Sequence, residues 1–310
     1  MLSDAWIYFI CSLAYGVPSV LLYLVTMLVI LTHRNSFGSS FFQLYIYDGA
    51  ANLYTYLVGF FAMRLSSVTC SACLLGSFYE QLEERYPRAL RFISAMTGHM
   101  AYVQYSITAL ISLNRLSVLL NHNFFEPFWK RTSMLFFILI IFLPFLETRR
   151  FFDWPAHVVY NNVTDSFSIT SEAVGKATIP WIIPSIIVTT LVSFLTNVTS
   201  LCYIRTATEQ RNRGELNFLI MMSITCVIQL VGTCATVSLW LMVRYPLNET
   251  LGSVVSTVLP FVSDALTLVQ PWLLVAFSQT IRAKVLSQFG LKSKEHASQL
   301  FAVRSTNSLV

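Results

Sequence analysis

Two aspartates stand inside long segments that are otherwise free of charge. Asp48 and Asp264 each interrupt an apolar stretch of the chain. An ionisable group in apolar surroundings is expensive, so it marks a place where polar groups converge or an ion binds. With oxygen ligands from Asn52 and Ser263, the two carboxyl groups would form one cluster that holds water or a sodium ion. The alternative is that one or both stay protonated and hydrogen-bond only to neighbouring helices.

A second polar interruption lies in ALISLNRLSVLL, residues 109–120, where Asn114 and Arg115 break an apolar run. An arginine costs about 2.5–3.5 kcal/mol at the centre of a bilayer but little at its interface, where the side chain snorkels. Arg115 is therefore either an ordinary boundary residue or a gating residue that changes partners when neighbouring helices move apart.

Motifs for catalysis, metal binding or nucleic-acid binding are not found in the sequence. The five histidines are scattered without metal-ligand spacing, and no GxSxG or HExxH motif is present. We also find no glycine-rich phosphate loop and no basic patch for nucleic acid. The sequence therefore predicts neither an enzyme, nor a metal site, nor a nucleic-acid-binding protein.

The amino-acid composition indicates that the chain lies in a lipid bilayer. Of its 310 residues 55% are hydrophobic and only 11% are charged, against about 25% charged in soluble domains. A membrane-spanning helix needs about 20 mostly apolar residues, and counting uncharged stretches predicts an all-α membrane protein with seven spans. The predicted spans are 5–31, 41–63, 92–120, 128–146, 177–204, 216–243 and 250–277.

The orientation of these spans follows from the basic residues. Placing the N-terminus outside puts most of the 20 Lys and Arg residues in the inner loops and tail, as the positive-inside rule requires. Glycosylation sequons at Asn162 and Asn248 then fall in outer loops. Asn248 is very near the membrane, so Asn162 is the better acceptor. A third sequon, at Asn197, lies inside the fifth span and should be silent.

After the last span, apolar residues recur at helical spacing over 279–289 and end at Gly290. This pattern predicts a short amphipathic helix in the inner interface. Residues 1–290 would then form one membrane domain, and the polar residues 291–310 a disordered cytoplasmic tail.

Cysteines offer one open question. Cys70 and Cys73 fall in the first outer loop, in an oxidising compartment. They pair with each other, pair between chains, or stay free.

Two motifs carry a resemblance to a known family. These are LNRLSVL (113–119) and SDALTLVQPWLLVAFSQTIR (263–282), together with the lone acid Asp48 in the second span. The chain resembles the nematode serpentine chemoreceptors of class gamma, within the G-protein-coupled receptor superfamily. The resemblance implies a seven-helix receptor at the plasma membrane, with the sensory cilium as a further expected location. It also implies a small extracellular ligand, such as an odorant or pheromone, and a heterotrimeric G protein as partner. Oligomeric state stays open.

Ligands of such receptors bind in the outer half of the bundle. The resemblance therefore points to His99 and Gln104 on the third helix, with Trp181 and Trp240 approaching from the fifth and sixth. The alternatives are an interhelical hydrogen bond for His99 and an interfacial position for the tryptophans.

On the inner side, Asn114-Arg115-Leu116 stands where the rhodopsin-like pattern has an acidic-Arg-Tyr triplet, so the usual acid–arginine lock is missing. We still expect this end of the bundle to contact the G protein. The residues predicted to do so are Asn114, Arg115, Phe124, Phe125, Arg205, Arg211 and Arg213. The alternative is that the aromatic residues lie among headgroups and the basic residues on anionic lipid.

Two other classes fit a polytopic membrane protein. A secondary transporter tends to show internal repeats and broken helices; we find no repeat, and two acids are too few to demand ion coupling. An inverted odorant-gated channel would have its N-terminus inside, which the distribution of basic residues and the sequon at Asn162 oppose.

Overall fold

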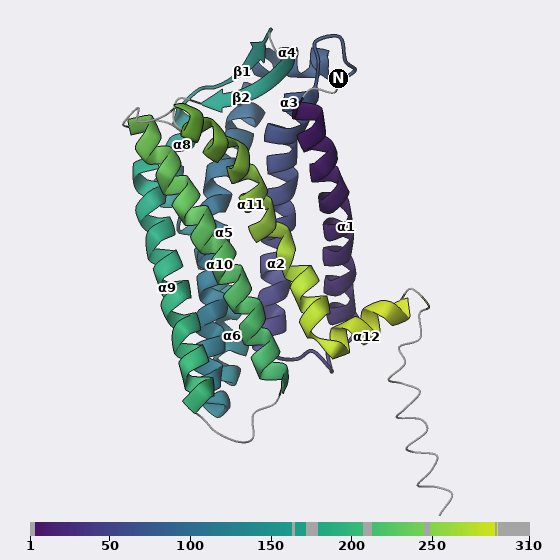
Figure 1. Cartoon of the computed structure of the whole chain (residues 1–310), viewed down its shortest axis with the longest axis vertical. Coiled ribbons are helices and arrows are strands. Elements are labelled where there is room, and N and C mark those ends of the chain that lie inside the picture. The colour runs from purple at the N-terminus through teal and green to yellow at the C-terminus, as the bar shows by residue number, and fades with distance from the viewer. Residues whose placement is uncertain are drawn as a thin grey trace, which may run out of the picture.

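Seven long helices run side by side in the computed structural model, which describes residues 4–162, 165–171, 179–206, 213–244, 249–288 and 290 (Figure 1). Their bounds are α1 (Asp4–Thr32), α2 (Ser40–Gly59), α5 (Pro87–Leu120), α6 (His122–Phe142), α9 (Ile179–Thr206), α10 (Arg213–Arg244) and α11 (Glu249–Phe277). The prediction of an all-α, seven-helix membrane bundle is confirmed.

The helix α2 differs from the other six in its surroundings. Six helices within the described residues are long and apolar enough to cross a membrane, and α2 is not among them. Its buried residues include the polar Ser40, Asp48 and Asn52, because α2 contacts α1, α5, α6 and α11. A helix enclosed by other helices does not need an apolar face for lipid. At its outer end α2 continues into a π-helical turn, η1 (Phe60–Leu65), and then into α3 (Ser66–Val68).

The helix α5 lies at the centre and contacts α2, α6, α9 and α10. Its 34 residues span about 51 Å, well beyond the roughly 30 Å of a bilayer core. It begins at Pro87, five residues before the predicted span, because proline is well suited to the first helical position. The helix α5 is therefore longer than the bilayer core is thick.

The fourth span also has different bounds from those predicted. Asn121 caps the start of α6, where its side chain accepts the Phe124 N–H at 3.2 Å, so the helix begins six residues earlier than residue 128. It ends at Phe142, shortly before Pro144, which lacks a backbone donor. Two short helices follow, α7 (Phe145–Thr148) and α8 (Arg150–Asp153).

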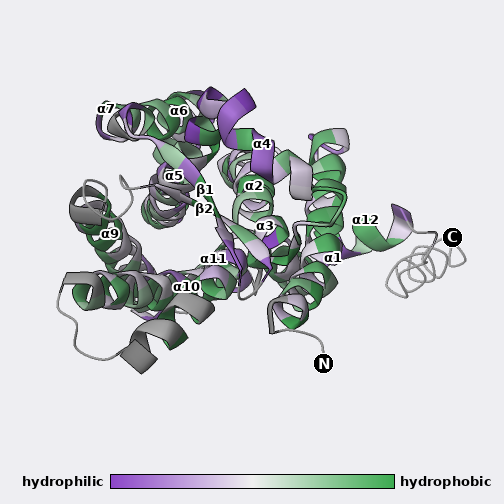
Figure 2. Cartoon of the chain, turned by 90° about the horizontal axis from the view of Figure 1, so that it is seen from above, coloured by the Kyte–Doolittle hydropathy of each residue, from purple (hydrophilic) through white to green (hydrophobic). Residues whose placement is uncertain are grey.

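The outer end of the bundle carries structure that the sequence did not lead us to expect. A helix, α4 (Gly76–Arg85), lies beside an antiparallel hairpin of β1 (Ala156–Asn161) and β2 (Ser166–Ser171). Seen from above, the hairpin crosses the ends of the helices (Figure 2). Of the three alternatives for the first outer loop, the structure forms the disulfide Cys70–Cys73.

At the opposite end, α12 (Gln279–Gln288) bends away from the axis of α11 (Figure 1). It buries Ile281 and Val285 and exposes polar residues, as expected for the predicted interfacial helix. The predicted tail, 291–310, lies outside the described residues.

Candidate functional site

A cavity of about 570 Å³ lies between α5, α9, α10 and α11. Its walls are mostly apolar, with Ile182 and Ile186 from α9, Trp240 from α10 and Leu266 from α11. Its size lies within the roughly 300–1,000 Å³ typical of sites for small molecules. The three residues Ile169, Thr170 and Ser171 of β2 also line it, so the hairpin forms part of its outer wall.

The predicted ligand-binding residues separate into three groups. Gln104 and Trp240 line the cavity. Trp181 belongs to α9, but its side chain is outside the described residues. His99 does not line the cavity and is a correction to our prediction. It is buried, with its Nδ1 2.9 Å from Thr148 Oγ1 and its ring stacked 4.0 Å from that of Phe145. His99 thus joins α5 to α7, the interhelical alternative.

The hairpin is attached to α4 by one glutamate. Glu83 accepts the Val158 N–H at 3.0 Å through Oε2, and its Oε1 lies 2.8 Å from His157 Nδ1. The hydrogen bond from the Val158 N–H lowers the pKa of Glu83 below its ordinary 4.5, and the hydrogen bond with His157 lowers it further. A lowered pKa means that the folded hairpin favours the carboxylate. This stabilisation is therefore present above pH 4.5 and is lost as the pH falls through the lowered pKa.

Replacing Glu83 by glutamine should loosen the hairpin. The pair is partly exposed, so we expect a modest loss of about 0.5–1 kcal/mol, seen as roughly two- to fivefold faster amide exchange of residues 156–161 at pH 7. Hydrogen exchange with mass spectrometry would measure it. The neighbouring exposed Glu84, changed to glutamine, is the matched control, and equal exchange in both variants would show that Glu83 does not hold the hairpin.

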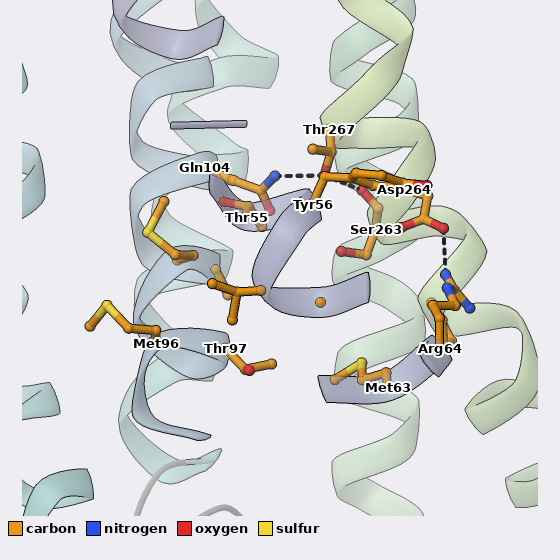
Figure 3. A pocket seen from close by; sticks show the side chains of 15 residues that line it. Thr55, Tyr56, Met63, Arg64, Met96, Thr97, Gln104, Ser263, Asp264 and Thr267 are labelled. Carbon is orange, nitrogen blue, oxygen red and sulfur yellow. Dashed lines mark hydrogen bonds and ion pairs between the residues drawn. The ribbon is translucent and has the colours of Figure 1, made fainter. Parts of the chain in front are cut away.

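A second cavity, of about 80 Å³, adjoins the first, and a larger share of its lining is polar. Figure 3 shows Arg64 beside the carboxylate of Asp264, with which it forms an ion pair. The Tyr15 hydroxyl of α1 also donates to this carboxylate. The side chains of Arg64 and Asp264 are only 11% and 14% exposed. Three helices, α1, α11 and the outer end of α2, are joined at this point.

Our sequence interpretation missed Arg64, because the predicted span ended at residue 63 and an arginine just beyond a span is normally a boundary charge. Arg64 lies in the π-helical turn η1. Such a turn changes the direction in which the following side chains point, and it occurs frequently at functional sites. The available signal was an arginine just beyond the outer end of the second span together with an unpaired acid in the middle of the seventh.

The two aspartates belong to different groups, which corrects the predicted shared cluster. Asp48 is buried, 1% exposed, and interacts with the amides of Asn52 and Gln270. Asn52 in turn accepts from Gln104 Nε2 at 3.0 Å. Asp264 instead binds Arg64 and Tyr15.

Ser263, the fourth residue of that predicted cluster, lines both cavities, and its backbone carbonyl accepts from Thr267. Because a guanidinium already neutralises the Asp264 carboxylate, this aspartate is a poor ligand for sodium.

At the inner end of the bundle, Arg115 joins three helices through aromatic rings. Its Cζ lies 3.9 Å from the ring centroid of Phe41 on α2 and 4.5 Å from that of Phe218 on α10. Cation–π contacts of this kind contribute about 0.5–2 kcal/mol. Both rings therefore contact the arginine of a triplet in which Asn114 replaces the usual acid.

Asn114 fixes the neighbouring helices in a second way. It is fully buried and donates to Ser40 Oγ at 2.9 Å. The Ser40 N–H and hydroxyl both donate to the carboxylate of Glu126 at 2.7 Å, so this acid of α6 lies at the start of α2, where the helix dipole favours negative charge. Our sequence interpretation had not assigned Glu126 a role.

The remaining predicted residues are only partly described. Phe124 is 63% exposed and Phe125 packs against the core at the start of α6, while Arg205 is exposed at the end of α9. Arg211 lies outside the described residues, and Arg213 begins α10 without a described side chain.

The three sequons differ in their surroundings. Asn162 is exposed beside β1, and Asn248 lies outside the described residues. Asn197 is buried in α9, where it donates to Ser112 Oγ at 3.1 Å.

Comparison with known proteins adds two findings. Residues 9–285 match the sequence model of a family described as Srg family chemoreceptor. Serpentine receptor class gamma-31 from Caenorhabditis elegans is 24% identical over 293 residues, covering 90% of this chain and 91% of that relative.

Proposed function

The chain belongs to the Srg family of chemoreceptors, and from this premise we propose that it binds a small extracellular molecule and signals to a heterotrimeric G protein. It is a multi-pass membrane receptor rather than an enzyme. We place it in the plasma membrane, with the sensory cilium as the expected site in a neuron. The ligand we expect is odorant-like or pheromone-like.

The observation that carries this proposal is the cavity of about 570 Å³ between α5, α9, α10 and α11. Residues of β2 form part of its wall, and the hairpin lies at the end of the bundle opposite α12 (Figure 1). A molecule arriving from outside would meet Gln104 and Trp240 there. We retain both as ligand contacts and leave out His99.

The inner end supports the second half of the proposal. Arg115 is held between rings from α2 and α10. Movement of α10 away from α5 would remove the Phe218 ring and release the guanidinium toward a partner protein. Phe124 and Arg205 are exposed at the same end, and aromatic and arginine side chains are favoured at protein interfaces. Phe125, Arg211 and Arg213 stay in the proposed contact region, whereas Asn114 is fully buried and is left out as a direct contact.

The mechanism we propose is conformational selection. The ligand binds preferentially to the form in which α10 has moved, and so raises its population. To shift a receptor from 1:99 to 99:1 active, it must bind the active form about 10⁴-fold better.

We further propose that the end bearing the hairpin is extracellular and carries a glycan on Asn162. Asn162→Gln should remove the mobility shift that N-glycosidase treatment produces in receptor from animal cells, because the exposed turn residue is accessible to the transferase. Asn197→Gln should leave that shift unchanged. A glycan retained in Asn162→Gln would point to Asn248 instead.

A signalling assay tests the function. Tagged receptor is expressed with a promiscuous G protein and screened with extracts and pure small molecules, and wild type is compared with Arg115→Ala at matched surface level. A response that Arg115→Ala loses supports ligand-driven coupling through this arginine. An equal response in Arg115→Ala would show that Arg115 is an ordinary boundary charge. A response that needs no G protein would contradict the proposed partner.

A further inference from the structure

The two cavities described above adjoin each other. Six residues line both: Met63, Thr97, Ala101, Gln104, Pro260 and Ser263. A ligand that occupied both would lie in a large chamber with isoleucine and leucine walls and in a smaller branch, relatively richer in polar groups, that Arg64 and Asp264 line (Figure 3). A site of this shape fits an amphiphile, with the apolar body in the chamber and the head group in the branch.

The charges in the branch balance each other. Arg64 and Asp264 are the charged residues among the described lining of both cavities, and they form an ion pair. A carboxylate or an ammonium head group would therefore add an unbalanced charge to a largely buried site, which is strongly unfavourable. A neutral head group leaves the pair intact.

The hydrogen-bonding groups in the branch favour an acceptor over a donor. The Asp264 carboxylate accepts from both Arg64 and Tyr15 through Oδ2, which uses two of its roughly four acceptor sites. Arg64 donates to Asp264 through one terminal nitrogen, and a guanidinium has five N–H groups in all. The branch thus has more donor capacity than acceptor capacity at its charged end.

The π-helical turn η1 positions this donor. It places Arg64 in the branch with its Cζ 5.1 Å from the ring centroid of Phe261 on α11. Contact with the ring and the ion pair to Asp264 hold the guanidinium against α11, so its direction is set before a ligand arrives.

We propose that the combined cavity selects a neutral amphiphile, such as a long-chain ketone, ester or lactone, whose carbonyl oxygen accepts a hydrogen bond from Arg64. The proposal rests on the proposed function, because it names the ligand class of the same site. Arg64 and Asp264 together determine specificity: the arginine supplies the donor, and the aspartate cancels the charge that would otherwise attract an acid.

Photoaffinity labelling of receptor in nanodiscs tests this ligand class without any signalling step. Four probes share one alkyl chain and a diazirine and end in a methyl ketone, a carboxylate, a trimethylammonium or a methyl group. Probe concentrations are corrected for partition into empty nanodiscs, and cross-links are mapped by mass spectrometry. In wild type we expect half-maximal labelling of α5 and α9–α11 by the ketone at a concentration at least tenfold below that of both charged probes.

Two variants identify the residues responsible. Asp264→Asn leaves Arg64 without its carboxylate, so the preference should reverse in favour of the carboxylate probe. The double variant Arg64→Met with Asp264→Asn, which leaves no lone charge, should remove the advantage of the ketone over the methyl-terminated probe. Ala101→Leu, which narrows the junction of the two cavities, should weaken labelling by the ketone most.

Three results would overturn the proposal: equal labelling by a charged probe in wild type, an undiminished ketone advantage in the double variant, or cross-links outside the cavity only. Labelling as expected, together with no G-protein response to any ligand, would overturn the proposed signalling and leave the ligand class standing.

Discussion

Replacing Asp264 by asparagine should destabilise the receptor more than any other single polar substitution in its outer half. The change leaves the Arg64 guanidinium, 11% exposed, without its carboxylate, and removing one partner of a buried pair costs about 3–5 kcal/mol. The measurement is thermal unfolding of purified receptor, with surface expression as a second readout. We expect both to fall sharply.

A double-mutant cycle separates the pair from other effects of the substitution. Adding Arg64→Met to Asp264→Asn should restore most of the lost stability, because no lone charge then remains. Asp48→Asn is the matched control: Asp48 is buried among the amides of Asn52 and Gln270 rather than beside a cation, so its loss should be smaller. Additive effects of the two substitutions in the pair would show that Arg64 and Asp264 do not interact.

Phe218→Ala should raise signalling in the absence of ligand. The Phe218 ring lies 4.5 Å from the Arg115 guanidinium, and its contact joins α10 to α5 in the closed form. Loss of a contribution of about 0.5–2 kcal/mol shifts the equilibrium toward the open form by roughly 2- to 30-fold. Basal G-protein activation at matched surface level measures the shift.

Two further variants show whether the ring itself is responsible. Phe218→Tyr keeps an aromatic face for Arg115 and should have near wild-type basal activity. Leu216→Ala removes an exposed apolar side chain from the same end of α10 and should leave basal activity unchanged. Basal activity that is the same in Phe218→Ala as in wild type would mean that this contact does not hold the receptor closed.

The fold could be predicted from sequence largely because lipid imposes a simple length rule. An uncharged stretch long enough to cross the bilayer has to be a helix, so the seven helices followed from counting. Their ends did not. The start of α5 depends on a proline at its first position and the start of α6 on the capping side chain of Asn121. A count of uncharged residues considers neither.

The site was harder to predict, because the direction of a side chain depends on neighbours that are distant in sequence. His99 and Gln104 were equally plausible pocket residues from their position in α5. In the structure Gln104 faces α2 and α11, whereas His99 faces Thr148 of α7.

The sequence also did not predict the ion pair of Arg64 or the outer hairpin. Arg64 was overlooked because the π-helical turn that brings it beside Asp264 leaves no mark in composition. The hairpin was missed because its strands are short and lie in a connecting segment that we read only for charge and cysteine.

The polar character of α2 has a consequence for biosynthesis. A helix that exposes Asp48 and Asn52 to lipid is a poor substrate for insertion on its own. In the part of the chain that the structure describes, α2 is not among the six helices that are long and apolar enough to cross a membrane. It must therefore enter the bilayer together with a helix that covers its polar face. The helix α1 precedes α2 in the chain, and its Tyr23 hydroxyl accepts from Asn52 at 3.1 Å. A substitution at this contact would act during translation, by leaving α2 outside the membrane and inverting every helix that follows.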